Sequence, residues 1–544
     1  MKKLIIWLLL VMVASQYSCK KFLDITPIDK LTGNNYYQSA NDIESNLTDM
    51  YGKLFDKYVQ TNTAGATGEF RSGEVIPSTG PNGGTQRVFR YDAGLLGGHT
   101  RTVAFSGTTS GFQAIPGSPV NDRSNLLNAI AFSYNGYPNY YNFVTLTSWT
   151  AYYQVIQSAN ILISKLTGGI PSLTADQTAR YIAEAKFIRC YCYFTMVRLY
   201  GDVVYYTAAY QKDPLARTDM VSVVKQCIAD LKPAKNDLPV AITDPSLRGV
   251  RASRGAVIGL LMNMDMWNAG FDPANKTAYY TETAALGQEL MDSQAFRLLP
   301  LGQWTTVTKG RSEESLFELF TTVNYSSNQS QVFSLAPFGE SFIHFPYRLP
   351  EYNFRSSPCV FTSDYMKKLY PDTQDDRLII WLDDPYNQNA ETFQLKKFAG
   401  NTFIDASQPN NTAIPDNTFL IMRYADAILL RAEALAELGQ TQPAIDVLNV
   451  VRARANAVRY PGGANDSNLK DAIFYERAKE LMGEGTHYFD LVRTKRIMNK
   501  TYTDNPLTSD KFSRGGWTWP IDQSALNNNP SMTLNAYWRG TGIE

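Results

Sequence analysis

The sequence RYADAILLRAEALAELGQTQPAIDVLNVVRARA, residues 423–455, decides the fold class. Apolar residues recur in it at helical spacing, with Ile428 and Ala432 on one face, and Gly439 ends the first helix. Pro443 lies in the first turn of a second helix, where its missing N–H costs nothing. Small residues at the crossing of two helices are typical of a tetratricopeptide-type hairpin, which needs neighbouring pairs to bury its apolar face. The stretch therefore predicts a mostly α-helical protein built from such pairs.

Helical spacing of apolar residues predicts further helices before this hairpin. They cover residues 41–58, 149–160, 182–194, 221–231, 253–267 and 279–292. A short apolar run at 315–322, SLFELFTT, predicts a strand. Two long stretches, 60–140 and 301–415, are rich in polar and turn-forming residues but also carry many aromatic rings. Loops of this length in a compact protein are usually functional or disordered, and the aromatic content favours order and function.

The composition excludes several classes of protein. Among 544 residues, Lys plus Arg and Asp plus Glu both total 51, so the net charge is zero, which argues against a nucleic-acid-binding protein. With 3 His and 5 Cys, the chain has too few ligands for a zinc framework or a disulfide scaffold. We expect no metal and no cofactor. Cys190, Cys192, Cys227 and Cys359 are interpreted as core thiols, and a bridge from Cys227 to one of the first two remains open.

The N-terminus has the form of a signal peptide. Lys2 and Lys3 precede an apolar run from Leu4 to Ala14, which is too short to span a membrane, and no comparable run follows. The small residue Ser18 directly precedes Cys19, an arrangement that predicts a lipoprotein signal peptide over 1–18 and a diacylated Cys19 as lipid anchor. Ordinary secretory cleavage is the alternative.

Four blocks of the sequence resemble the SusD/RagB family. They are CKKFLDITP at Cys19 with NDIESNLTDMYGKLF at 41–55; AEAKFIRCYCYFTMVRLYGDV at 183–203; the hairpin with ERAKELMGEGTHYFDLVR at 476–493; and WPID at 519–522 with Asn529, Pro530, Asn535 and Tyr537. The blocks follow the order of the family over nearly the whole mature chain. His487 and Asp522 replace residues more usual in the family, an Arg and a Pro.

The resemblance implies a SusD-like fold, with tetratricopeptide-like helix pairs, a few short strands and an irregular, loop-rich ligand region. It implies one domain over 19–544, with an N-terminal part of about 19–240 and a C-terminal part of about 250–544. It further implies a binding protein without enzymatic activity. Such a lipoprotein, anchored in the outer membrane and facing outward, would hold a glycan as the lid of a SusC-like TonB-dependent transporter.

Aromatic residues of the two irregular stretches are the candidates for a glycan-binding face. A sugar ring has an apolar C–H face and a rim of hydroxyls, which suits an aromatic plane flanked by polar groups. The predicted ligand-binding residues are Arg90, Tyr91, Trp304, Asn324, Tyr325, Phe338 and Trp381. Trp149 and Tyr153 occur at helical spacing and are assigned to the core instead.

Three other functions remain open. The first keeps the same role with an oligopeptide as cargo. The second is a surface glycosidase, which needs two carboxyl groups flanking the scissile bond. Its candidates are the adjacent pairs Glu313 and Glu314, Asp375 and Asp376, and Asp383 and Asp384, which we interpret as solvated surface residues with no catalytic role. The third is a bare helical-repeat scaffold without a ligand face.

Overall fold

The computed structural model describes most of the chain after residue 35. The described residues are 36–61, 65, 67–77, 146–322, 338–347, 357, 359–387, 391–403, 413–463, 468–527 and 529–539. Cys19 and the signal peptide therefore lie outside them, as do the side chain of Cys359 and most of the first irregular stretch. None of the described helices is both long and apolar enough to cross a membrane.

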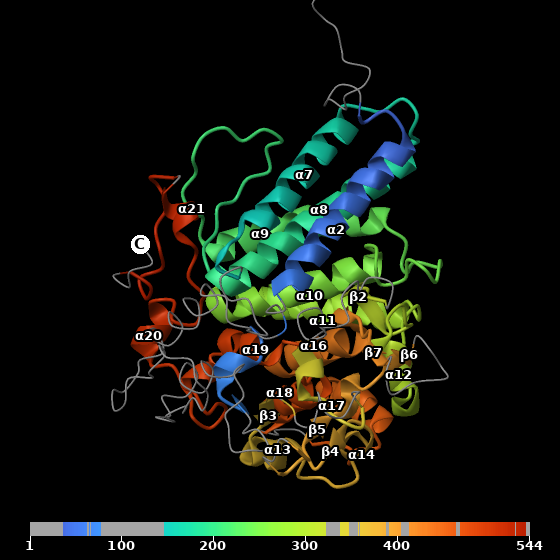
Figure 1. Cartoon of the computed structure of the whole chain (residues 1–544), viewed down its shortest axis with the longest axis vertical. Coiled ribbons are helices and arrows are strands. Elements are labelled where there is room, and N and C mark those ends of the chain that lie inside the picture. Colours follow the sequence, from blue (N-terminus) through green and yellow to red (C-terminus); the bar gives the residue numbers. More distant parts are fainter. Residues whose placement is uncertain are drawn as a thin grey trace, which may run out of the picture.

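The body consists of helices stacked in pairs (Figure 1). The longer helices are α2 (Ala40–Thr61), α7 (Thr150–Thr167), α8 (Ala175–Tyr200), α9 (Met220–Ala234), α10 (Arg254–Phe271), α11 (Lys276–Asp292), α16 (Tyr424–Glu437), α17 (Thr441–Arg454), α18 (Leu469–Glu480) and α19 (His487–Arg493). The pairs α7 with α8, α10 with α11, and α16 with α17 are hairpins of consecutive helices, while α2 packs on α7 and α9 packs on α8. The expectation of a mostly helical fold with paired helices is confirmed.

Local sequence explains where these helices begin and end. Thr174 starts α8 with reciprocal bonds: its hydroxyl accepts the N–H of Gln177 at 3.2 Å, and the Gln177 side chain accepts the N–H of Thr174 at 2.9 Å. In the hairpin of α16 and α17, Gly439 has φ +75° and follows the end of the first helix, as predicted. Pro443 lies in the first turn of α17, and Ala432 is fully buried at the crossing.

The short strands form four two-stranded antiparallel ladders. They join β1 (Val75–Pro77) to β3 (Cys359–Phe361), β2 (Ser315–Leu319) to β8 (Phe419–Arg423), β4 (Leu382–Asp383) to β5 (Gln394–Leu395), and β6 (Asn401–Phe403) to β7 (Ala413–Pro415). The predicted strand is therefore present but ends at Leu319. The remaining elements are α12 (Trp304–Thr308), α13 (Ser363–Leu369), α14 (Arg377–Ile380), α20 (Ser509–Ser513) and α21 (Gln523–Asn527), with short 3-10 turns between them.

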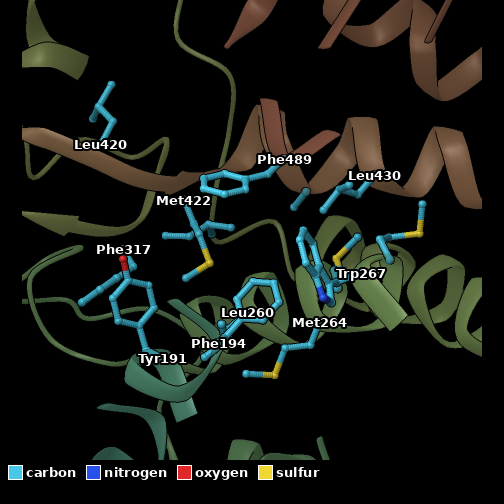
Figure 2. Packing of buried hydrophobic residues seen from close by; sticks show 14 of the residues in the cluster. Tyr191, Phe194, Leu260, Met264, Trp267, Phe317, Leu420, Met422, Leu430 and Phe489 are labelled. Atoms are coloured by element: carbon cyan, nitrogen blue, oxygen red, sulfur yellow. The ribbon is translucent and has the colours of Figure 1, made fainter. Parts of the chain in front are cut away.

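A shared hydrophobic core joins the two halves of the chain. Figure 2 shows side chains that meet there from α8, α10, β2, β8, α16 and α19: Tyr191, Phe194, Leu260, Met264, Trp267, Phe317, Leu420, Met422, Leu430 and Phe489. Phe317 contacts Tyr191 with ring centroids 5.3 Å apart, and Trp267 lies 6.3 Å from Phe194. Trp149 is buried in the same core, as the sequence predicted.

Beneath the irregular C-terminal region, charged side chains form a buried ion network centred on Glu480. The network comprises Glu314, Asp375, Arg377, Lys397, Arg423, Arg454, Glu476, Glu480 and Glu484, all of them buried or nearly so. Arg423, the last residue of β8, donates from Nη1 to Glu314 at 2.6 Å and to Glu480 at 2.7 Å. Its Nε donates to Glu484 at 2.9 Å.

Three further cations complete the Glu480 network. Glu480 accepts a bond from Arg454, and it accepts one at 3.0 Å from Arg377, whose other donors bind Asp375 and Glu476. Lys397 pairs with Glu484 and also donates to the carbonyl of Glu480 at 2.8 Å. Because each charge here has an opposite partner and hydrogen bonds, the network avoids the cost of an unpaired buried charge.

The network holds the turn at residues 483–485 tightly against the N-terminal part of the chain. Gly485 has φ +80°, and a Cβ placed on it would lie 2.6 Å from the Cα of Gly65. A Cβ on Gly68 would lie 1.7 Å from the carbonyl oxygen of Gly485, so neither position has room for a side chain. The N–H of Tyr488 donates to Gly68 at 2.6 Å and fixes the contact.

We expect Glu480→Ala to lower the free energy of unfolding by about 3–5 kcal/mol, because it leaves several buried cations without their shared carboxylate. Urea unfolding followed by tryptophan fluorescence measures this change. The control is Asp49→Ala, which removes a solvent-exposed pair with Lys53 on α2 and should cost no more than about 1 kcal/mol. Equal effects of the two substitutions would contradict a structural role for the network.

Candidate functional site

The structure places the described members of the predicted ligand face inside the molecule. Trp304, Phe338 and Trp381 are 5%, 2% and 1% exposed, so none presents an open ring to a ligand, and the expectation is corrected for these three. The other four predicted ligand-binding residues, Arg90, Tyr91, Asn324 and Tyr325, lie outside the described residues and stay predictions.

The two tryptophans are buried because they cover the Glu480 network. Their rings lie 4.5 Å apart, and the Nε1 of Trp304 donates to the carbonyl of Lys397 at 2.8 Å. The ammonium of Lys397 lies 4.6 Å from the ring of Trp381, and the guanidinium of Arg454 lies 5.7 Å from that of Trp304. Aromatic faces stabilise desolvated cations, so these rings have partners within the protein.

Two of the carboxylates assigned to the solvated surface also belong to this network. Glu314 and Asp375 are buried, and they pair with Arg423 and Arg377 respectively. The assignment to the solvated surface is therefore wrong for these two carboxylates. Their role is nonetheless structural, because each forms a buried ion pair. Of the other four candidates, Glu313 pairs with Arg297 at the surface.

A central cavity lies where the 483–486 turn meets α8 and β8. Its volume is about 60 Å³, which is room for a few water molecules and well below the roughly 300–1,000 Å³ of ligand pockets. It is lined by Tyr58, Gly65, Tyr191, Arg198, Phe338, Phe398, Phe419, Leu420, Ile421, Gly483, Glu484, Gly485, Thr486 and Phe489. The guanidinium of Arg198 lies 4.9 Å from the ring of Phe489, and its Nε has no hydrogen-bond partner among the described residues.

Three chain segments that belong to the irregular stretches meet beside this cavity. Pro77 in β1 is paired with Cys359 in β3, and Phe338 begins the 3-10 turn η7 (Phe338–Phe342). Phe342 stacks on Phe361 with centroids 4.6 Å apart, and a Cβ on Gly65 would lie 2.8 Å from that of Phe338. We call this meeting point the junction. Residues 77, 338 and 359, which belong to the two irregular stretches, are therefore held close together on the body.

Buried titratable groups lie directly under the junction. Glu69 accepts the N–H of Gly485 at 3.1 Å, and burial raises the pKa of its carboxyl to about 7. His487 lies 3.9 Å from Glu74. Burial disfavours its charged form, but Glu74 and Glu69 outweigh that effect and raise the pKa of His487. Elsewhere, on β2, burial likewise raises the pKa of Glu318 to about 7.

Sequence reasoning missed the charged members of this site. Arg198 and Glu484 both lie in blocks that resemble the family, but no role was assigned to them. The available signal was the density of charge in ERAKELMGEGTHYFDLVR, where Glu476, Arg477 and Glu480 occur within five residues of a helix. A helix with ionic residues around its circumference is either solvated or paired internally, and here the charges are paired internally.

Comparison with known proteins places these features in a family. The model of the SusD family matches residues 314–538, and a second model, described as starch-binding and associating with the outer membrane, matches residues 117–264. SusD-like protein P38 of Formosa agariphila is 22% identical, with 98% of both chains covered.

Solved structures agree with these sequence matches. A SusD homolog from Bacteroides thetaiotaomicron is 31% identical, with a TM-score of 0.76 and coverage of 92% of this chain and 99% of the other. A laminarin-binding SusD-like protein is 21% identical, with a TM-score of 0.63 over 92% and 99% of the two chains, and so shows the shared fold.

We expect Trp304→Ala and Trp381→Ala to destabilise the protein by about 3–5 kcal/mol each, since each leaves a cavity over desolvated cations. The measurement is the free energy of unfolding in urea, with Trp381→Phe as a milder control. Glycan affinity of the folded fraction should be unchanged, and a loss of affinity without a loss of stability would restore both rings to the ligand face.

The shifted pKa values predict that stability is greatest near pH 5. Glu69 and Glu318 have folded pKa values above those of the unfolded chain, so the folded state takes up protons first and gains stability as the pH falls from 7 to about 4.5. Burial opposes ionisation of Glu476 and Asp490, but arginines outweigh it and lower both pKa values to about 2. That stabilisation is present above pH 4.5 and is lost as the pH falls towards 2.

Glu69→Gln tests the predicted direction of the change in stability with pH, because the amide keeps an acceptor oxygen but carries no charge. We expect the variant to be more stable than the wild type at pH 7 by roughly 2–4 kcal/mol, with the difference shrinking by pH 5. Melting temperatures across pH 4–8 measure it. Glu313→Gln, at the surface, should show no such convergence, and a constant offset for Glu69→Gln would contradict the prediction.

Proposed function

Because the chain belongs to the SusD/RagB family, we propose that it captures a glycan at the cell surface and delivers it to a SusC-like TonB-dependent outer-membrane transporter, acting as its lid. Its mechanism is binding and release, without catalysis. The cargo is bound by side chains of the two irregular stretches, among them Arg90, Tyr91, Asn324 and Tyr325.

The observation that carries this proposal is the junction. Pro77, Phe338 and Cys359 belong to the irregular stretches and lie together on a body fixed by the Glu480 network. We propose that side chains of both stretches reach a single ligand from this place on the body. Binding residues on loops held by a rigid scaffold are a common arrangement, since the scaffold limits the entropy lost on binding.

A glycan is favoured over a peptide by two observations. The laminarin-binding neighbour shares this fold, and the model that matches residues 117–264 carries a starch-binding description. The irregular stretches also combine aromatic with amide and guanidinium groups, which suits the C–H face and hydroxyl rim of a sugar. Oligopeptide cargo is the alternative that binding experiments separate.

The outer-membrane location is supported by the description of the same family model. We propose that the signal peptide over 1–18 is removed and that lipids on Cys19 anchor the domain over 19–544, facing outward. A glycosidase finds little support, because Glu314 and Asp375 are occupied by buried guanidinium groups and neither is available as a general acid.

We expect a soluble form beginning at Asp24 to bind one class of glycan by calorimetry, without releasing shorter products. Tyr91→Ala and Tyr325→Ala should each weaken binding about tenfold or more, since stacking on a sugar ring is lost. Tyr210→Ala is the matched control, because Tyr210 is 60% exposed and lies on the separate segment after α8. Oligopeptides, tested alongside, should not bind.

Binding of peptides alone would replace glycan capture by peptide capture, and hydrolysis of any glycan would overturn the non-catalytic role. Unchanged affinity in both tyrosine variants would show that the ligand face lies elsewhere.

A further inference from the structure

A surface groove of about 480 Å³ lies between the segment after α8 and the C-terminal segment of the chain. One wall comes from residues 201–202 and 216–220, the other from residues 512–518 and 531–539, and Phe271 at the end of α10 lies between them. Figure 1 shows the C-terminal segment, with α20 and α21, along one side of the body. The volume lies within the range of small-molecule sites. The groove shares no lining residue with the central cavity.

The groove is positively charged although the whole chain is neutral. Its lining contains Arg217, Arg514 and Arg539 but a single acidic residue, Asp202. Arg217 donates to the carbonyls of Tyr200, Asp202 and Thr533 at 2.7–2.8 Å, so its partners are neutral. The carboxylate of Asp202 favours the charge of Arg217 from a distance, but no carboxylate of the described residues forms an ion pair with it, so the guanidinium can still attract an anionic ligand.

Arg514 is more exposed to solvent than Arg217. Its Nη1 lies 3.5 Å from Asp510 and its Nη2 lies 3.3 Å from the carbonyl of Ala536, so both bonds are long. The pair with Asp510 is exposed, and such pairs contribute little. A guanidinium has five N–H donors, so Arg514 can rearrange to bind a carboxylate or sulfate through two of them.

The floor of the groove is aromatic and also lies near an unpaired cation. The rings of Phe271 and Phe512 are parallel, 6.1 Å apart, and Trp517 lies 5.5 Å from Phe271. The ammonium of Lys495 lies 3.7 Å from the Phe271 ring and 4.4 Å from that of Phe512. Within the part of the chain that the structure describes, Lys495 has no ion-pair partner, and burial lowers its pKa to about 8. A nearby anion would relieve this desolvation.

Polar groups surround this floor. Ser513, Thr533 and Asn535 line the groove, and Nδ2 of Asn535 already donates to Tyr200 and Thr518 at 2.9 and 2.8 Å. This arrangement leaves the Oδ1 of Asn535 to accept a bond from a ligand hydroxyl. The apolar floor, the polar groups that can bond hydroxyls and the guanidinium groups together match a sugar ring that carries both hydroxyls and an acidic group. A simple ion would bind the arginines alone.

We propose that this groove is a second ligand site, which binds an acidic saccharide through its carboxylate or sulfate group. Arg514 and Arg217 hold the anion, and the aromatic floor carries the ring. None of its lining residues belongs to the stretches to which glycan capture is assigned, and it rests on the proposed function only in taking the ligand to be a saccharide.

Calorimetry with tetragalacturonate and with its methyl ester tests the proposal, because the ester keeps the sugar rings and hydroxyls but replaces each carboxylate by a neutral group. The soluble form beginning at Asp24 should bind the acid at least tenfold more tightly than the ester, and raising NaCl from 0.05 to 0.5 M should weaken the binding. Arg514→Glu should weaken it at least tenfold. Arg459→Glu, at an exposed position after α17, makes the same charge change away from the groove and should change the affinity less than twofold.

Ala216→Trp supplies a second variant that keeps the charge and fills the groove from an exposed position in its wall. It should also weaken binding of the acid. Equal affinity for acid and ester, or full affinity in both Arg514→Glu and Ala216→Trp, would overturn the proposal, and glycan capture would stand if neutral glycans still bound through Tyr91 and Tyr325.

The anionic group could also belong to a lipid. Vesicles of phosphatidylcholine with and without phosphatidylglycerol distinguish this source in a co-sedimentation assay. Binding to the anionic vesicles that is lost in Arg514→Glu, without any binding of tetragalacturonate, would overturn the assignment to a saccharide. Binding of tetragalacturonate without vesicle binding supports it.

Discussion

The pairing of buried charges around Glu480 is the interaction on which the rest of the structure depends. Its carboxylate bonds Arg377, Arg423 and Arg454, which come from α14, β8 and α17, so one side chain joins three segments of the C-terminal half. Isolated in a protein interior, any of these charges would cost several kcal/mol. The segments are therefore stable only together. This mutual requirement fixes the turn at 483–485, and through Gly485 it fixes the N-terminal segment at Gly65 and Gly68.

The same constraint explains why sequence reasoning succeeded for the helices and failed for the irregular region. Apolar patterning is a local property, and it located α2, α8, α10 and α16 and the strand β2 because the residues that each element buries lie within its own segment. The burial of Trp304 is not local. It depends on Lys397 and Arg454, about 90 and 150 residues further along the chain, and no pattern near residue 304 reveals them.

The buried carboxylates could not be located from the sequence for a similar reason. Glu314 and Asp375 stand in polar stretches that are typical of turns, so a solvated surface was the reasonable interpretation. Their partners Arg423 and Arg377 were equally visible, but a sequence does not say which acid meets which base. The helix of Glu476, Arg477 and Glu480 held the usable clue, because it combines this density of charge with apolar residues such as Ile473 and Phe474 in one short segment. For the candidate site, the sequence alone could indicate the two irregular stretches, but it could not show which of their aromatic rings are buried in the protein.

The net charge of zero is the sum over regions that differ in charge, and it does not describe a uniformly neutral surface. In the interior, acids and bases lie within a few ångströms of one another, as they do around Glu480, so their fields largely offset each other. In the groove beside α20, Arg217 binds carbonyl oxygens and Lys495 binds ring faces, so their charge is not cancelled by carboxylates. A carbonyl or a ring satisfies the donors of a cation but leaves its net charge in place. Total charge therefore does not identify the arginines that are available to a ligand. The structural arginines pair with carboxylates, whereas the available ones bind neutral groups.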